Sequence, residues 1–425
     1  MAFTMTDVVL GIDIGTSGVR IVASDRIGAL AAMAKAPIVA PIQDSGRSLQ
    51  DPRIWWSAIE QAFALLDLND LNVLALAIDG TSGTILAVDK NGEPLGLASM
   101  YNDLAERVDV DKVLAVAPME TAARGGSSPL ARAISMQNGA IRILHQADWL
   151  AGQFSGRFNV SDENNALKSG YDPIARVWPS WIAGTGFDAG LFPTVVPAGM
   201  ATGTILPGIA DKFGLFKTVS IVAGTTDGCA AFLASGASEP GDGVTSLGTT
   251  LTLKLLSDRP VFSPEYGIYS HRIGDQWLAG GASNSGGGVL RKYFSSEDIA
   301  RLTDLIDPDV PTGLDYYPLP QAGERFPIAD PNFAPRMTPR PSDDRVFFQA
   351  MLEGIAHVEQ QGYRRLVELG ATPLKSIRSV GGGAASEPWT KIRLNALGVA
   401  AKSSVSEHAA MGTARLAWRG IGHAN

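Results

Sequence analysis

The stretch Val8–Ser24, VVLGIDIGTSGVRIVAS, consists of two apolar runs separated by a Gly-Thr-Ser-Gly turn. Apolar runs bounded by turn residues are typical of buried β-strands, so we expect a strand, a tight turn and a second strand. One acid, Asp13, lies in the first run, just before the turn. A carboxylate inside a buried strand needs a physical reason, because an unpaired charge is costly to remove from water.

A similar stretch occurs in the second half of the chain, at Asp242–Asp258, DGVTSLGTTLTLKLLSD. Gly15-Thr16-Ser17 of the first turn matches Gly248-Thr249-Thr250 of the second. Turns of this kind gather backbone N–H groups and hydroxyls in a concave loop that binds anions, phosphates above all. One copy alone is also typical of an ordinary hairpin. Two copies, one in each half, predict a duplicated α/β domain whose turns hold the phosphates of a nucleotide across a cleft.

Two acids near these turns are candidates for phosphoryl-transfer chemistry. Mg²⁺ is usually held by one or two carboxylates together with phosphate oxygens, and Asp13 is placed to support it. The alternative is a strand-end aspartate that caps its own turn. Asp227, in GTTDGCAA, opens an Ala-rich helix. It is either a helix N-cap or the base that accepts the proton of an attacking hydroxyl.

The composition narrows the class of protein. A length of 425 residues favours two domains. With 35 basic and 43 acidic residues the net charge is -8, which gives no electrostatic footprint for nucleic acid or an anionic membrane. A single cysteine, Cys229, excludes a disulfide framework within the chain and fits a cytoplasmic location. We expect neither a secretion signal nor a membrane-spanning helix.

Other segments predict further elements. Val73–Gly80 and Thr84–Gly96 are typical of two strands around a turn. Residues 343–370 combine an acidic start, a helical apolar pattern and a glycine stop, so we expect a long helix there. The segment Gly280–Val289 is rich in glycine but does not fit the dinucleotide-binding pattern, and we interpret it as a loop that leads into a helix.

Four segments, taken in order, resemble those of the FGGY-type carbohydrate kinases, which belong to the actin and hexokinase superfamily. They are GIDIGTSGVR, AGTTDGCAAFLASGA, GDGVTSLGTTLTL and SVGGGAASEPWTKIRLNALGV. The resemblance extends over nearly the whole chain. It implies an α/β fold with two ribonuclease-H-like domains around a deep cleft. Residues 1–235 would form the sugar-binding and catalytic domain, with a helix of about 408–425 packing back on it, and residues 236–407 the nucleotide-binding domain.

The resemblance also implies roles for individual residues. Asp227 would take the proton of the sugar hydroxyl, and Asp13 and Asp227 would support Mg²⁺. The implied ATP contacts are Gly15, Thr16, Ser17, Gly248, Thr249, Thr250, Gly382, Gly383 and Ser386, with Trp389 either against the base or in the core. The implied sugar contacts are Asp13, Thr81, Ser82, Asp103 and Asp227.

The resemblance points to a ketopentose as substrate. Thr81-Ser82-Gly83-Thr84 stands where many xylulose kinases carry Gln-Met-His-Gly, and the chain is short for the family. Both features resemble the small D-ribulose kinases, so conversion of D-ribulose to D-ribulose 5-phosphate is the first hypothesis. D-xylulose, or another ketose or polyol, comes next. A non-enzymatic, actin-like nucleotide-driven interaction protein is the alternative from another class. We expect ATP and Mg²⁺ as cofactors and a cytoplasmic monomer or homodimer without nucleic-acid or membrane partners.

Overall fold

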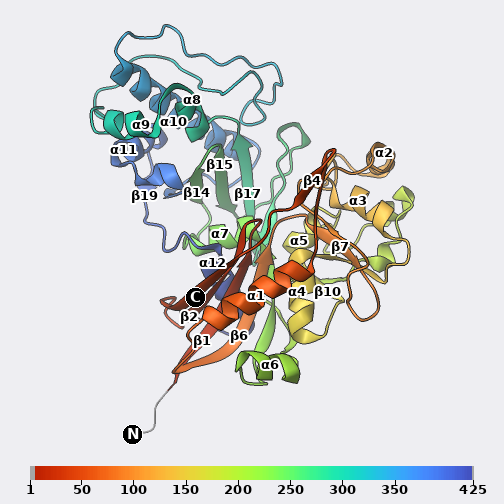
Figure 1. Cartoon of the computed structure of the whole chain (residues 1–425). Coiled ribbons are helices and arrows are strands. Elements are labelled where there is room, and N and C mark those ends of the chain that lie inside the picture. The colour runs from red at the N-terminus through yellow and green to blue at the C-terminus, as the bar shows by residue number, and fades with distance from the viewer. Residues whose placement is uncertain (1–4, 424–425) are drawn as a thin grey trace. The chain divides into compact units, whose positions relative to one another are not determined.

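The structure, a computed structural model, describes residues 5–423 and divides into two compact units (Figure 1). Unit 1 holds the described residues through Ala234, the segment His271–Gly274 and the residues from His408 onward. Unit 2 holds Ser235–Ser270 and Asp275–Glu407. The expected last helix is α12 (Ala409–Gly420), and residues 424–425 lie outside the described part of the chain.

Unit 1 is built on a six-stranded sheet with the order β12-β13-β6-β1-β2-β3. Strand β1 is antiparallel to β2 and parallel to β6, and β6 is parallel to β13. The opening sequence therefore forms the expected strand, turn and strand. The strands are β1 (Thr6–Ile14), β2 (Gly18–Asp25), β3 (Leu30–Pro37), β6 (Leu71–Gly80), β12 (Ala201–Thr204) and β13 (Ser220–Thr226).

Helices cover both faces of this sheet. On one face, Leu10 and Ile12 share a core with Trp55 of α1 (Arg53–Leu65) and Leu150 of α4 (Gln146–Ser155). On the other face, Val9 packs in a core with α12, which also contacts α7 (Asp227–Ala234). Successive residues of a strand point to opposite faces, so a strand covered on both sides is apolar throughout. This explains why the first run has almost no polar residues apart from Asp13.

Helix α12 approaches its neighbours closely because two glycines leave room for it. A Cβ at Gly11 of β1 would lie 1.9 Å from the Ala410 carbonyl oxygen of α12. A Cβ at Gly412 of α12 would lie 1.9 Å from the Ala230 carbonyl oxygen of α7. Backbone thus packs directly on backbone at both contacts. This close packing fixes α12 against the strand that carries Asp13 and the helix that begins with Asp227.

We expect Gly412→Ala to destabilise the protein by about 1–3 kcal/mol, because the new methyl group has no space against Ala230. In a helix interior, alanine is normally more stabilising than glycine by about 0.5–1 kcal/mol. A loss of stability in Gly412→Ala would therefore indicate the clash, because the ordinary effect has the opposite sign. Gly208→Ala in α6 (Pro207–Phe213) is the matched control, since nothing lies within 4 Å of its added Cβ. Urea unfolding of both variants measures the effect, and a Gly412→Ala protein as stable as the parent would contradict this packing.

The rest of unit 1 forms a second sheet with the order β4-β5-β8-β7-β9. The two strands expected around a turn exist as β6 and β7, but they lie in different sheets and do not pair with each other. The two strands do not pair because the segment between them, Thr81–Thr84, forms a turn that redirects the chain. The elements are β4 (Ile42–Asp44), β5 (Arg47–Gln50), β7 (Ile85–Val88), β8 (Ala98–Ser99), β9 (Arg142–His145), α2 (Arg107–Val116) and α3 (Pro129–Met136).

Shorter elements complete unit 1. Strands β10 and β11 pair in parallel, and α5 begins directly after β10. The bounds are β10 (Val160–Asp162), α5 (Glu163–Leu167), β11 (Thr194–Val196) and β16 (His271–Ile273), with 3₁₀ turns at Ser180–Thr185 and Ala189–Leu191.

Unit 2 repeats the strand order of unit 1. Its strands follow the order β17-β15-β14-β18-β19, with β14 antiparallel to β15 and parallel to β18. In unit 1 the strands β3-β2-β1-β6 are related in the same way. The sequence repeat is therefore a repeat of topology. The strands are β14 (Asp242–Leu247), β15 (Leu251–Ser257), β17 (Gln276–Ser283), β18 (Ser376–Val380) and β19 (Ala400–Ala401).

The expected long helix is confirmed as α10 (Asp344–Glu368), which packs on β15 and β17 in the core of unit 2. The glycine-rich segment Gly280–Val289 differs from expectation in part: its first residues belong to β17, and α8 begins at Gly287. The remaining elements are α8 (Gly287–Tyr293), α9 (Ser296–Thr303), α11 (Glu387–Leu397) and 3₁₀ turns at Pro264–Tyr266 and Gly382–Ala385.

Candidate functional site

A row of polar residues crosses the large sheet of unit 1 near the carboxyl ends of its parallel strands. Asp13 of β1 pairs in register with Asp79 of β6 and with Arg20 of β2. Arg20 in turn pairs with Lys35 of β3, and Asp79 pairs with Thr225 of β13. Side chains of paired residues project from the same face of a sheet. Two acidic residues, Asp13 and Asp79, and two basic residues, Arg20 and Lys35, therefore lie at one edge of this sheet.

Asp79 is the most buried member of this row, with no exposed surface. Thr413 of α12 donates a hydrogen bond to its Oδ2. Its Oδ1 has no donor among residues 5–423. Burial raises the pKa of Asp79 well above its usual range, and the neighbouring charge of Asp13 raises it further. Both effects favour the neutral form of the Asp79 carboxyl group.

Asp13 lies beside Asp79 on the neighbouring strand. Burial raises the pKa of Asp13, while a hydrogen bond with Asp79 and the charges of Arg20 and His408 lower it. The Arg20 guanidinium lies 3.7 Å from Asp13 Oδ2. Two close carboxyl groups disfavour each other's charged form. Asp13 also lines the hollow beside the Gly15–Gly18 turn.

Asp227 is the first residue of α7, directly after β13, and its side chain is half-buried. Its Oδ1 accepts a hydrogen bond from the Gly228 N–H at 2.7 Å. Its charge acts on Asp79, so it belongs to the same electrostatic cluster as Asp13 and Asp79. A helix N-terminus favours negative charge, so the position suits a carboxylate.

The turn between β1 and β2 borders a hollow of about 500 Å³. The Gly15 N–H donates to the Gly18 carbonyl, which closes the turn. A Cβ at Gly18 would lie 2.8 Å from the Ala36 carbonyl oxygen, so glycine lets the turn rest on β3. The hollow is lined by Asp13, Gly15, Ser17, Gly18, Val19, Arg20, Lys35, Ala36 and Pro37. Its turn and cations suit an anion such as phosphate.

The turn between β14 and β15 in unit 2 is braced by a second glycine loop. The N–H groups of Gly287 and Gly288 donate to the carbonyls of Gly248 and Thr249, each at 2.9 Å. Arg291 donates to Thr249 Oγ1 at 2.7 Å. The turn is therefore held in one conformation, and Arg291 adds a positive charge beside it.

The residues expected to contact adenosine lie between β18 and α11. Gly382 and Gly383 form a 3₁₀ turn, and Ser386 caps α11 through the Trp389 N–H. Trp389 is only 3% exposed and sits in the core of unit 2. Its ring covers Gly383, where a Cβ would lie 2.4 Å from it. Of the two interpretations of Trp389, this burial favours the core aromatic over a contact with the base.

The expected sugar segment follows β6. The Thr81 hydroxyl and N–H both bond to Gln146 Oε1, at 2.9 and 3.0 Å, so Thr81 serves to fix the segment. Ser82 differs, because its Oγ is buried and has no partner within the described chain. The Nε2 of Gln146 is likewise without a partner. Buried polar atoms require hydrogen bonds, so these atoms need water or a hydroxylated ligand.

Asp103 is placed differently from the expectation of a sugar contact. It is fully buried, and its Oδ1 accepts bonds from Arg47 Nε and the Ser48 N–H, at 2.9 and 2.8 Å. Its Oδ2 accepts bonds from Arg47 Nη2 and Ser99 Oγ. Burial alone would raise the pKa of Asp103, but the bonds from Arg47 and Ser99 outweigh it and lower the pKa. All four lone-pair positions are used within the protein, so Asp103 holds its loop in place, and its contact with sugar stays a prediction.

Arg132 is a buried cation that ties the sugar segment to this loop. It is 2% exposed, and burial lowers its pKa to about 10, so it is still charged at neutral pH. It donates to the carbonyls of Ser99, Met100 and Gly83. The backbone next to Ser82 is therefore held by a guanidinium rather than left to loop motion.

A hydrogen-bonded series of Ser169, His145 and Asp148 resembles the triad of a hydrolase. Ser169 Oγ lies 2.9 Å from His145 Nε2, and His145 Nδ1 lies 3.0 Å from Asp148 Oδ2. Each of the three is at most 6% exposed, however, and Asp148 also caps α4 at the His145 N–H. A substrate has no access to this serine. The three residues therefore serve to connect segments of unit 1 by hydrogen bonds.

Several site residues escaped the sequence interpretation. Asp79 directly precedes a glycine at the end of an apolar run, and Asp13 lies two residues before one, Gly15. Arg20 and Lys35 were not singled out, and Thr413 lies hundreds of residues from its partner Asp79. The signal available in each case was a polar residue in an otherwise apolar element.

The carboxylates of unit 1 fit a Mg²⁺ ion whose other ligands come mainly from a nucleotide. Within residues 5–423 no group of three or more His, Cys, Asp or Glu side chains is arranged to hold a metal by itself. Asp13 and Asp227 supply one or two carboxylates next to a phosphate-type turn, which is the usual Mg²⁺ arrangement in phosphate-binding enzymes. Among the described residues, no helix has the length and apolar character needed to cross a bilayer.

Comparison with known proteins assigns the chain to a family. The N-terminal domain pattern of the FGGY family of carbohydrate kinases matches residues 8–112, and its C-terminal domain pattern matches residues 243–421. Together the two matches span more than half of the sequence. The chain therefore belongs to the FGGY family of carbohydrate kinases, and it is a sugar kinase that uses ATP. This excludes the alternative of a non-enzymatic nucleotide-driven protein.

Individual relatives are distant but extend over most of the chain. A xylulose kinase of Staphylococcus epidermidis is 23% identical, covering 98% of this chain and 88% of its own length. A ribulokinase of Halalkalibacterium halodurans is 26% identical over 44% of this chain and 39% of its own length. The crystal structure of a xyloylose kinase from Brucella ovis has a TM-score of 0.86 at 23% identity, covering 98% of this chain and 91% of that chain. The structural likeness confirms the predicted fold of two actin/hexokinase-like α/β domains.

Proposed function

We propose that the protein transfers the γ-phosphoryl group of ATP to the terminal hydroxyl of a ketopentose, with D-ribulose as first substrate and D-ribulose 5-phosphate as product. The observation that carries the proposal is the acidic row of unit 1. Asp13 and Asp79 stand side by side on β1 and β6, next to the Gly15–Gly18 turn, and the charge of Asp227 reaches the same cluster.

The proposed chemistry uses Asp227 as the base. The terminal sugar oxygen attacks the γ-phosphorus, the bond to the bridging oxygen of ADP breaks, and Asp227 accepts the hydroxyl proton. Phosphoryl transfer has a loose transition state, so positioning and charge matter more than base strength. Arg20 and Lys35 line the hollow beside the turn and are placed to stabilise charge on phosphate oxygens.

Magnesium and ATP complete the proposal. Asp13 would hold Mg²⁺, with Asp227 as a second carboxylate, and the ion would neutralise charge on the phosphates. The turns Gly15–Ser17 and Gly248–Thr250 are both proposed to bind phosphates, and Gly382, Gly383 and Ser386 to contact adenosine. In unit 1 the raised pKa of Asp79 favours its neutral form, which limits the negative charge beside Asp13.

Two ketopentoses are supported by different observations. The segment Thr81–Thr84 lacks the Gln-Met-His-Gly of many xylulose kinases, which favours D-ribulose, and its Ser82 hydroxyl is available to a hydroxyl of either sugar. D-xylulose is the second candidate, because relatives such as the Staphylococcus epidermidis protein carry the name xylulose kinase. A cytoplasmic location and a monomeric or dimeric state remain predictions.

A coupled assay of ADP release tests the proposal across D-ribulose, D-xylulose, L-ribulose, gluconate and glycerol, each with ATP and Mg²⁺. We expect D-ribulose to give the highest kcat/KM and D-xylulose the next. Highest turnover with gluconate or glycerol would contradict the ketopentose assignment. ADP release that no sugar raises above the sugar-free rate would contradict the site as a whole.

We expect Ser82→Ala to raise the KM for the sugar about 5–10-fold, with little change in kcat, because one hydrogen bond to substrate is lost. Its thermal stability should be unchanged or slightly higher, since a buried hydroxyl without a partner is removed. Ser57→Ala, on the exposed surface of α1, is the control and should leave the KM unaltered. A Ser82→Ala enzyme with parental KM for every ketose would remove Ser82 from the sugar site.

A further inference from the structure

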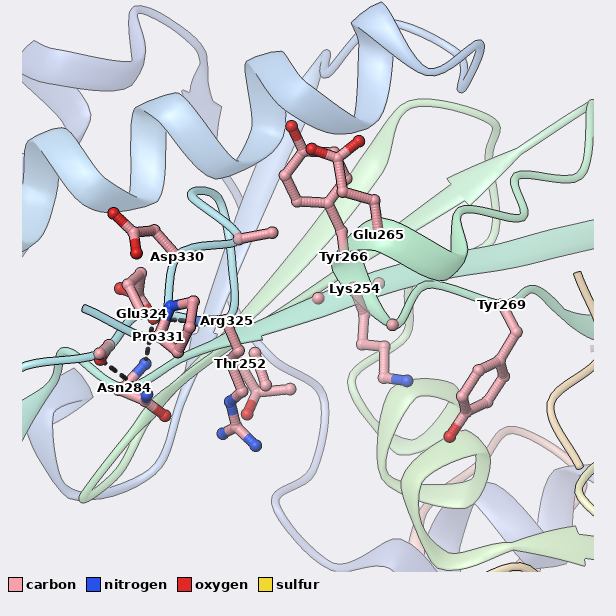
Figure 2. A pocket seen from close by; sticks show the side chains of 16 residues that line it. Thr252, Lys254, Glu265, Tyr266, Tyr269, Asn284, Glu324, Arg325, Asp330 and Pro331 are labelled. Atoms are coloured by element: carbon pink, nitrogen blue, oxygen red, sulfur yellow. Dashed lines mark hydrogen bonds between the residues drawn. The ribbon is translucent and has the colours of Figure 1, made fainter. Parts of the chain in front are cut away.

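A hollow of about 790 Å³ opens on unit 2 beside β15 and β17 (Figure 2). Leu251, Leu253 and Leu255 of β15 pack in the core together with α10. Thr252 and Lys254 alternate with them and therefore project from the opposite face, into the hollow.

Glycines in β17 create the space. Lys254 pairs in register with Gly280, and Leu253 pairs with Gly281. A Cβ at Gly280 would lie 2.8 Å from Lys254 Cδ, so a larger residue would displace the lysine stem. Strand interiors lose stability when they contain glycine, and glycine there often marks a site where another group approaches the backbone closely.

The loop that bounds the hollow is held by one buried acid. Glu324 is 3% exposed and accepts hydrogen bonds from Ser283 Oγ at 2.6 Å, the Asn284 N–H at 2.8 Å and Tyr317 Oη at 3.0 Å. It also accepts from the N–H of Arg325 at 2.9 Å. The Glu324 carboxylate thus bonds to groups of the protein itself, and these bonds fix the backbone from which the Arg325 side chain extends.

Lys254 and Arg325 bring two positive charges to the hollow. Neither forms an ion pair or a side-chain hydrogen bond with any residue of the described range. In Figure 2 the Lys254 ammonium lies on the side of Tyr269, and the Arg325 guanidinium on the side of Asn284. Unneutralised cations that line one concave surface attract an anion, and a guanidinium matches the geometry of phosphate.

The rest of the lining suits a hydroxylated molecule rather than a bare anion. Tyr266 is half-buried and offers a ring surface, with Arg365 over its ring at 5.0 Å. Asn284 adds an amide at the other end. Glu265 and Asp330 are carboxylates of the lining that accept bonds from hydroxyls and disfavour a polyanion. A single phosphate attached to a polyhydroxyl chain satisfies both sets of groups.

We propose that this hollow is a second binding site, specific for a small phosphorylated sugar, in which Lys254 and Arg325 bind the phosphate. The site goes beyond the proposed function and does not depend on which ketose the enzyme phosphorylates. A sugar phosphate and a nucleoside monophosphate both carry a phosphate monoester, so the test separates these sources.

Isothermal titration calorimetry tests the proposal with D-ribulose 5-phosphate as the probe. The full-length protein is first saturated with a non-hydrolysable ATP analogue and D-ribulose, to occupy the catalytic site. We expect binding to one remaining site, weakened about 10–100-fold in Lys254→Ala and in Arg325→Ala, because a charge-assisted contact is lost in each. Lys90→Ala, an exposed lysine of unit 1, is the charge-matched control and should bind as the parent does.

Thermal unfolding of both variants verifies that they are folded, and their kcat should equal that of the parent. Absence of binding to the saturated parent, or equal binding by the parent and both variants, would overturn the proposal. Titrations with inorganic phosphate and with AMP distinguish the ligand class: equal affinity for inorganic phosphate, or tighter binding of AMP, would contradict the assignment to a sugar phosphate.

Discussion

Asp227→Asn is expected to lower kcat about 10²–10⁴-fold, the range for loss of a general base, with a much smaller change in the KM for the sugar. The amide keeps the shape of the side chain but cannot accept the hydroxyl proton. Asp227 also begins α7, so the substitution removes a favourable charge from a helix N-terminus, at a cost of about 0.3–1 kcal/mol in stability. Steady-state kinetics with the best ketose measures the first effect, and thermal unfolding the second.

The matched control is Asp344→Asn. Asp344 is the first residue of α10, as Asp227 is of α7, but it is exposed on unit 2 and pairs with Arg340. The control should show a similar small loss of stability and no loss of kcat. An Asp227→Asn enzyme that works at the full parental rate would remove Asp227 from the base role and leave it as a helix N-cap.

Asp13→Asn is expected to lower kcat/KM about 10²–10³-fold, the range for loss of one electrostatic contact to the transition state. Since Asp13 is proposed to hold Mg²⁺, the variant should also require a higher Mg²⁺ concentration for half-maximal rate. Stability should be equal to or greater than that of the parent, because burial, the largest effect on its pKa, disfavours the charge on Asp13. Rates measured over a Mg²⁺ titration, together with urea unfolding, separate these effects.

Asp7→Asn serves as the control on the same strand. Asp7 lies near the other end of β1, where it pairs with Arg26 at 2.9 Å and accepts a bond from Asn72. Its replacement should leave both the rate and the Mg²⁺ requirement unaltered. If Asp13→Asn showed the parental Mg²⁺ dependence, Asp13 would be a turn-capping residue rather than a metal-supporting one.

Much of the acidic row was within reach of sequence reasoning. A turn closed between Gly15 and Gly18 places Asp13 opposite Arg20, because paired positions of a hairpin are equidistant from its turn. The parallel partner Asp79 follows the same apolar-run-then-glycine pattern as Asp13, but the register of parallel strands depends on the whole sheet. Thr413 was beyond reach, because its contact with Asp79 joins residues at opposite ends of the chain.

Asp103 shows what a motif match alone leaves out. Its position in the chain matched a sugar-binding segment, yet Arg47 and Ser48 occupy its oxygens from a hairpin more than fifty residues earlier. Trp389 shows a similar limit for burial. The sequence does not tell whether its ring is buried or open to a bound base, and the structure shows the ring buried against Gly383. The duplicated turns, in contrast, were predictable because strand, turn and strand are consecutive in sequence.

The most direct test of the account is the identity of the product. The enzyme is incubated with ATP, Mg²⁺ and D-ribulose, and the product is analysed by mass spectrometry and by phosphorus-coupled NMR. The account predicts a pentulose heavier by one phosphoryl group, with the phosphate on the terminal carbon and one ADP formed for each sugar converted. A phosphate on any other carbon, or ADP formation without a phosphorylated ketopentose from any sugar of the panel, would contradict it.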